Sequence, residues 1–187
     1  MMSTSLPDGR PFKSTQNIAR LGLMLAMAIA LSLLEGLLPP LPSPVPIRYG
    51  LANIAVMATL IYLGPWEAFG VAVLKSLFVL MTRGILAGFV SLTGTLLSVL
   101  AMIALEIWTR GRVSIFLMSV TGAILHNMGQ FLCLFVFLRY QLPLLLIVPP
   151  LIVFGIVTGL LSAVLLYAIR KPMQAFFRDN GSGKTAS

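Results

Sequence analysis

The chain contains very few of the residues that form disulfides, metal sites or acidic catalytic clusters. Its 187 residues include one cysteine, Cys133, one histidine, His126, and five acidic residues. A single cysteine excludes an intrachain disulfide, and one cysteine with one histidine cannot complete a metal cage. Only two acidic residues are aspartates, Asp8 and Asp179, and both lie in terminal segments. We therefore expect no metal and no other cofactor.

Charged residues are scarce as well, at 10% of the chain against 58% hydrophobic residues, and the mean hydropathy is +1.00. This composition excludes an ordinary soluble domain. Several apolar blocks reach the roughly 20 residues that cross a bilayer. The net charge of +8 could suit a nucleic-acid-binding protein, but basic loops in a membrane protein usually report its orientation. The lipid membrane is thus the expected partner, and nucleic acid is not.

The apolar blocks predict an all-α fold, an integral membrane bundle of six transmembrane helices. Breaks rich in proline, glycine and arginine separate the blocks. Two cytoplasmic tails are expected to flank the transmembrane domain of residues 19–169, a polar one at 1–18 and a basic one at 170–187. The predicted spans are residues 19–38, 49–64, 66–82, 84–108, 113–138 and 143–169.

The distribution of basic residues predicts the orientation of the bundle. Six spans put both termini on one side, together with most of the arginines and lysines. Only Arg48, Arg83 and Arg139 lie on the other side, and Lys75 lies inside the third span. Because cytoplasmic loops carry an excess of basic residues, both termini are predicted to be cytoplasmic.

Polar side chains inside the spans gather in one half of the predicted membrane layer. At about 1.5 Å per helical residue, the charged, amide and imidazole side chains fall at or above the midplane, on the side away from the termini. The exceptions are Glu67 and Glu106, both close to the cytoplasmic boundary. Such a layer favours an outward-facing pocket over scattered contacts between helices, and its positive excess favours an anionic solute. The candidate solute-binding residues are Glu35, Arg48, Asn53, Lys75, Arg83, His126, Asn127 and Gln130.

Structural roles remain open for several of these residues. Glu35 could pair with Lys75 or Arg48 and only join helices, and the two arginines could extend to lipid head groups. His126 and Gln130 share a helix face and are predicted to line the pocket. Asn127 points about 100° away and is expected to join helices.

Small residues form two stripes on predicted helices. In the first span, Gly22, Ala26 and Ala30 lie opposite Glu35, so they can face outward and contact a partner subunit. In the fourth span, small residues separated by four, three, four and three positions predict close helix packing. These residues are Gly84, Gly88, Ser91, Thr95 and Ser98. Five prolines between Pro39 and Pro46 exclude a helix there and suit either a lid over the pocket or a rigid connector.

These segments resemble the Gx transporter family, also labelled heptaprenyl diphosphate synthase component I. The resemblance rests on four blocks spread over about residues 20–165. They are Leu34-Glu35-Gly-Leu-Leu-Pro39 with Arg48-Tyr-Gly-Leu-Ala-Asn53, Ser91-Leu-Thr-Gly94-Thr-Leu-Leu-Ser98, Gly122-Ala-Ile-Leu-His126-Asn127-Met-Gly129-Gln130 and Gly155-Ile-Val-Thr-Gly159.

The resemblance implies a six-helix fold similar to the substrate-binding S components of energy-coupling factor (ECF) transporters. It implies a subunit of a bacterial cytoplasmic (inner) membrane transporter that captures a small anionic micronutrient or precursor. The implied partners are a transmembrane coupling subunit, contacted through Gly22, Ala26 and Ala30, and ATPases. The alternative is a non-transport accessory subunit of isoprenoid or quinone metabolism, or of a redox complex.

The sequence argues against an enzyme. Prenyl transfer normally needs aspartate clusters that hold Mg²⁺, and this chain has only Asp8 and Asp179. The tail Gly181-Ser-Gly-Lys-Thr185 is no phosphate-binding loop, because Arg178 stands where that motif needs its first glycine. Any ATPase activity is therefore expected from partners.

Overall fold

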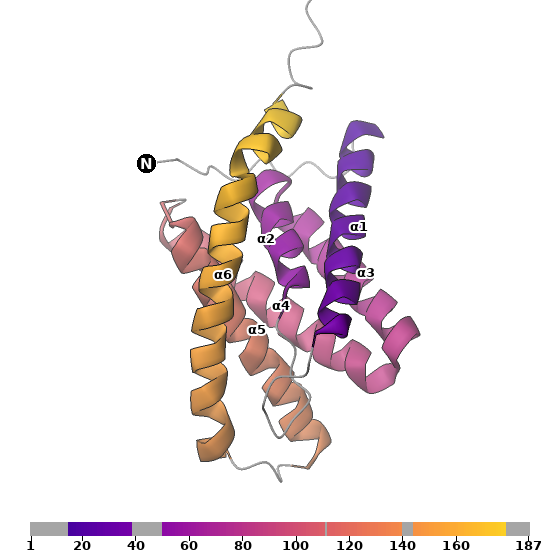
Figure 1. Cartoon of the computed structure of the whole chain (residues 1–187), viewed down its shortest axis with the longest axis vertical. Helices are drawn as coiled ribbons and strands as arrows, with labels where there is room; N and C mark the ends of the chain where they lie inside the picture. The colour runs from indigo at the N-terminus through magenta and orange to yellow at the C-terminus, as the bar shows by residue number, and fades with distance from the viewer. Residues whose placement is uncertain (1–14, 39–49, 111, 140–143, 179–187) are drawn as a thin grey trace, which may run out of the picture.

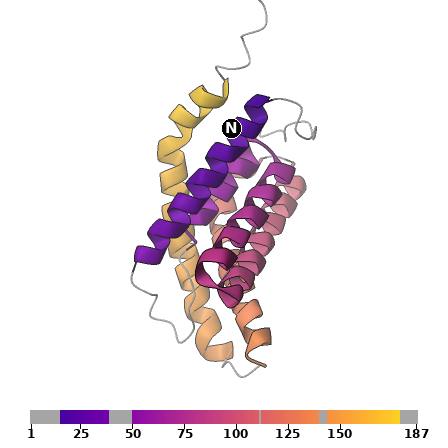
Figure 2. The same cartoon turned by 90° about the vertical axis from the view of Figure 1, so that its right-hand side faces the viewer.

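The computed structural model describes residues 15–38, 50–110, 112–139 and 144–178. All regular structure in these residues is α-helical, as predicted. The helices are α1 (Thr15–Leu37), α2 (Ala52–Tyr62), α3 (Pro65–Arg83), α4 (Ile85–Trp108), α5 (Ile115–Phe137) and α6 (Leu144–Arg178). Figures 1 and 2 show an elongated bundle in which α1 begins and α6 ends at the same end.

Five of these helices are long and apolar enough to cross a membrane by length and composition, namely α1, α3, α4, α5 and α6. The exception is α2, whose 11 residues span about 16 Å, roughly half of a 30 Å hydrocarbon core. The membrane-embedded helical bundle is thus confirmed, whereas six full crossings and cytoplasmic termini stay predictions.

The short helix α2 forms the centre of the bundle. It lies between α1 and α6 in Figure 1 and contacts all five other helices. Residues 52–60 are all buried, including Asn53 and Thr59. A helix that is apolar all round is one surrounded by other helices rather than by water or lipid. This central position explains why a span too short for the bilayer is still a stable element.

The outer helices expose large apolar side chains, as a bundle in lipid requires. Leu23 and Leu33 of α1, Phe89 of α4 and Val157 of α6 are each about half or more exposed. At its C-terminal end α6 continues to Arg178, into the segment expected to be a basic tail. Straight-chain residues such as Arg170, Lys171 and Gln174 favour helix, so the apolar block ends before the helix does.

Glycines bring α4, α5 and α6 into close contact. A Cβ atom at Gly129 would lie 2.7 Å from the carbonyl oxygen of Thr93 and 2.8 Å from Gly94 Cα. At Gly159 in α6, a Cβ atom would lie 2.6 Å from Val120 Cα of α5. Backbones approach this closely in membrane bundles only where small residues meet. These crossings fix the height and the rotation of α5, the helix that carries His126.

The predicted close packing of the α4 stripe is confirmed from Gly88 to Ser98, whereas Gly84 precedes the helix and is exposed. Gly88 faces Leu80 of α3, and the hydroxyls of Ser91 and Ser76 lie 3.3 Å apart. Further along α4, Thr95 and Ser98 accept hydrogen bonds from Lys75 of α3 and Asn53 of α2. The stripe therefore holds two of the predicted site residues in place.

Candidate solute-binding site

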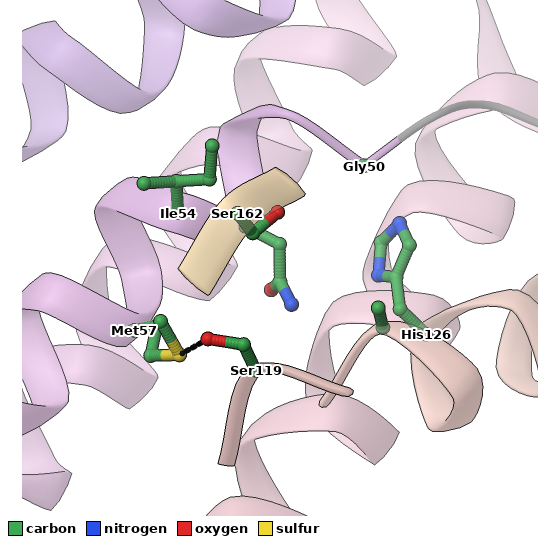
Figure 3. A pocket seen from close by; sticks show the side chains of 8 residues that line it. Gly50, Ile54, Met57, Ser119, His126 and Ser162 are labelled. Atoms are coloured by element: carbon green, nitrogen blue, oxygen red, sulfur yellow. Dashed lines mark hydrogen bonds between the residues drawn. The ribbon is translucent and has the colours of Figure 1, made fainter. Parts of the chain in front are cut away.

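Two adjacent hollows lie among the buried polar residues. They share Gly50, at the start of the segment that leads into α2, and His126 of α5. The first, shown in Figure 3, has no charged group among its described lining residues, which are Gly50, Asn53, Ile54, Met57, Ser119, Ala123, His126 and Ser162. The second contains charged groups and is lined by Ser32, Glu35, Gly50, Ala52, Lys75, Val79, Val90, Ser91, His126 and Gln130. We call them the neutral hollow and the charged hollow.

Both hollows are narrow in this conformation. Their empty volumes, counting space open to solvent, are about 290 Å³ for the neutral hollow and 300 Å³ for the charged one. Only about 10 and 20 Å³ of this space can hold the centre of a water molecule, which is room for about one water in each. A larger ligand therefore requires lining side chains to move, and His126 borders both spaces.

The imidazole of His126 is packed against two glycines. A Cβ atom at Gly50 would lie 3.1 Å from His126 Cδ2, and one at Gly94 would lie 3.1 Å from His126 Cε1. Gly50 also has a φ of 79°, a left-handed conformation that other residues rarely adopt. The two glycines thus let the ring fit between α4 and the start of α2. The ring is 4% exposed, and its Nδ1 has no hydrogen-bond partner among the described residues.

The charged hollow brings together side chains from five helices, α1 to α5. Glu35 of α1 is buried, and its Oε1 accepts a hydrogen bond of 2.7 Å from the amide of Gly50. Lys75 of α3 is 2% exposed, and its Nζ donates to Thr95 Oγ1 at 2.7 Å. The described structure thus gives Glu35 and Lys75 different direct partners, although their charges interact. Gln130 of α5 is 1% exposed and completes the wall with His126.

The neutral hollow is lined by an amide and two hydroxyls. Asn53 donates from Nδ2 to Ser98 Oγ at 2.8 Å, while its Oδ1 is buried without a partner. Ser119 donates to the sulfur of Met57 at 3.3 Å, the dashed line in Figure 3. Ser162 donates to the carbonyl oxygen of Thr158 at 2.7 Å. These groups come from α2, α5 and α6, so the hollow lies where three helices meet.

Two of the predicted site residues that the structure describes, Asn127 and Arg83, line neither hollow. Asn127 donates from Nδ2 to the carbonyl oxygen of Leu151 in α6 at 3.3 Å, the contact between helices expected for it. Arg83 donates from Nη2 to the carbonyl oxygen of Ser32, near the end of α1, and its Nη1 is buried without a described partner. Arg48 and the prolines from Pro39 to Pro46 lie outside the described residues.

Arg83 is expected to stabilise the end of α1. Arg83→Met should lower the free energy of unfolding by about 1 kcal/mol, because the hydrogen bond to Ser32 is lost and a cation near a helix C-terminus interacts favourably with the helix dipole. In a chain of this size, that loss corresponds to a melting temperature about 2–4 °C lower. Thermal unfolding in detergent measures the change, with Arg112→Met as the control at an exposed arginine. Equal melting temperatures for the two variants would contradict this role.

Sequence reasoning missed several lining residues, namely Ser32, Gly50, Ser119 and Ser162. Serines are common in membrane helices, where they often bond to a carbonyl of their own helix, as Ser162 does. No charge or motif marks them, and only the packing of α5 against α2 and α6 shows which serines meet. Ser91 was marked by the small-residue stripe, but only as a packing residue.

The face of α1 opposite the site is open. Gly22, Ala26 and Ala30 are all exposed, as predicted, whereas Met24, Ala28, Ser32 and Glu35 face the bundle. No atom lies within 4 Å of the position that a Cβ would take at Gly22. The small-residue stripe is therefore accessible along more than two turns of the helix.

Comparisons with known proteins agree on the class of the chain. The family model described as "Heptaprenyl diphosphate synthase component I" matches residues 24–169. A solved chain described as the S component of a bacterial ECF transporter superposes with a TM-score of 0.62 at 16% sequence identity. The superposition covers 87% of this chain and 98% of that one, which establishes a similar fold. No curated protein matches the sequence significantly.

Proposed function

The chain belongs to the heptaprenyl diphosphate synthase component I family, and we propose from this premise that it is the solute-binding subunit of an ECF-type uptake transporter. The observation that carries the proposal is the charged hollow. Its polar lining is buried among the helices of a bundle whose fold resembles an ECF S component. Ionisable residues that share a cavity inside the membrane are, by default, candidates for a functional site.

A small anionic solute fits the charge of this site. Lys75 offers three N–H donors, and the described residues give it one hydrogen bond, to Thr95. Glu35 is held by the amide of Gly50. Arg83 adds a second positive charge near Glu35. Two cations against one carboxylate favour a carboxylate, phosphate or diphosphate group beside Lys75.

Transport would then proceed by capture and coupling. The solute enters from the outer side of the cytoplasmic membrane, and both termini lie in the cytoplasm. The exposed stripe of Gly22, Ala26 and Ala30 on α1 packs against the helices of a transmembrane coupling subunit. ATPases bound to that subunit supply the energy, because this chain is not an enzyme and binds no nucleotide itself.

A second candidate function follows from the name of the family. A hollow with a basic group and apolar residues such as Val79 and Val90 in its walls also suits a prenyl diphosphate or a quinone precursor. The chain would then be a membrane accessory subunit of isoprenoid or quinone metabolism, or of a redox complex. Catalysis of prenyl transfer would belong to a partner, because such chemistry normally uses aspartate clusters that hold Mg²⁺ and the sequence has only two aspartates, Asp8 and Asp179.

Copurification of the full-length protein separates these functions. The wild type, expressed in its native membrane, should bring down a coupling subunit and ATPases. Ala26→Leu with Ala30→Leu should reduce that recovery at least about tenfold, because larger side chains keep packed membrane helices apart. Ala104→Leu places the same change at an exposed alanine of α4 and should leave recovery unchanged. Recovery of a prenyltransferase or a redox enzyme in place of ATPases would favour the second function.

A further inference from the structure

The neutral hollow contains a buried hydrogen-bond acceptor, Asn53 Oδ1, that has no donor among the described residues. Asn53 is 9% exposed and uses its Nδ2 on Ser98, so its Oδ1 is left without a partner. Nδ1 of His126 is also buried without a partner. A buried carbonyl oxygen that gives up its hydrogen bond to water is destabilised unless a donor replaces the water.

The two hydroxyls in this hollow have already used their hydrogens. Ser119 donates to Met57 and Ser162 to Thr158. Each hydroxyl has one hydrogen and two acceptor lone pairs, so both can accept from a molecule in the hollow while they keep these bonds. The remaining side chains of the described lining, Ile54, Met57 and Ala123, have no N–H or O–H group. Besides the imidazole, the donor left among these side chains is the second N–H of the Asn53 amide, whereas Asn53 Oδ1 and both hydroxyls can accept.

The two hollows differ in chemistry and meet at the same two residues. Lys75 supplies donors and positive charge in the charged hollow, whereas Asn53, Ser119 and Ser162 supply acceptors in the neutral one. Gly50 and His126 border both. A solute that occupies both spaces must therefore pass these two residues.

We propose that the neutral hollow binds the hydrogen-bond-donating end of a bifunctional solute, a terminal hydroxyl, amide or amino group, while the anionic end of the same molecule contacts Lys75. This inference rests on the proposed function for the anionic end, and it adds a second requirement for recognition. A site built of buried acceptors discriminates strongly against an analogue without the donor, because the acceptors then stay unpaired.

Paired probes test this requirement. The first set is a series of alkyl phosphonates with a terminal hydroxyl and two to five methylenes. The second set replaces each hydroxyl by a methyl group and so conserves the number of heavy atoms. Binding to the purified full-length protein in lipid nanodiscs is measured by titration calorimetry. We expect at least one hydroxyl probe to bind tenfold or more tightly than its methyl counterpart.

A double variant locates the effect. Asn53→Leu with Ser162→Ala removes the unpaired amide oxygen and one hydroxyl acceptor, and it keeps the lining of the charged hollow unchanged. The preference for hydroxyl should fall to threefold or less, with little change for the methyl probes. Thr93→Ala is the matched control, since Thr93 is partly buried, donates to Phe89 in its own helix as Ser162 does to Thr158, and lines neither hollow.

The outcomes separate this inference from the proposed function. Equal binding of hydroxyl and methyl probes would show that water satisfies the acceptors, which overturns the inference but leaves the anion site in place. A preference that persists in the double variant would also overturn it. No binding of any phosphonate would overturn both the inference and the anionic solute. The wild-type comparison needs no variant, so it remains decisive even if the double variant fails to fold.

Discussion

Lys75→Met is expected to lower the affinity of the full-length protein for short alkyl phosphonates by about 100-fold or more. The buried ammonium of Lys75 has donors beyond its bond to Thr95, and charge-assisted hydrogen bonds contribute about 1.5–3 kcal/mol each. Methionine is of similar length and apolar, so it fits the space but cannot bind an anion.

The fold should survive this substitution. Replacing a buried charged group by an apolar one of similar size is often neutral for stability, although Glu35 then loses the nearby positive charge. Titration calorimetry measures the affinity, and thermal unfolding reports the stability. Lys171→Met is the control, an exposed lysine near the end of α6. Unchanged phosphonate affinity in a folded Lys75→Met protein would exclude Lys75 from the site.

Gly129→Val is expected to have the largest effect on stability. The added Cβ would lie within 3 Å of backbone atoms of Thr93 and Gly94, and backbone cannot move aside as a flexible side chain can. The substitution must separate α4 from α5, at a cost of about 3 kcal/mol or more. Because His126 and Gln130 lie on the same stretch of α5, phosphonate binding should be lost together with stability.

Gly70→Ala in α3 is the matched control for this prediction. No atom lies within 4 Å of the position that its Cβ would take. Alanine favours a helix over glycine by about 1 kcal/mol, so this variant should be as stable as the wild type or more so. Thermal unfolding in the same detergent compares the two variants. If the Gly129→Val protein had the same melting temperature as the wild type, α4 and α5 would not be in backbone contact.

Much of the site could be predicted from the depth of each polar residue in its span. That estimate placed Glu35, Lys75, His126 and Gln130 in one layer, and the structure gathers them around one hollow. The estimate works because helical rise is nearly constant and polar groups in lipid are few. It also gave Asn127 a separate role, since helical periodicity alone shows that it points away from His126.

Other features depend on contacts that helical rise cannot supply. The contact of Arg83 with the end of α1 requires knowing that α1 and α3 are neighbours. The neutral hollow requires knowing that Ser119 and Ser162, on different helices, face α2. The length of α2 was overestimated because its flanking residues Leu51 and Leu63 are as apolar as the helix itself. Hydropathy records where the chain is apolar, but not which part of it is helical.

The shortness of α2 also affects how this protein is made. A segment of about 16 Å cannot remain across the bilayer as an independent helix while the ribosome is still synthesising its neighbours. Only Leu63 and Gly64 separate α2 from α3, so the two segments are expected to leave the translocon as one hairpin. The centre of the bundle is thus the part whose biogenesis depends most on the order of membrane insertion.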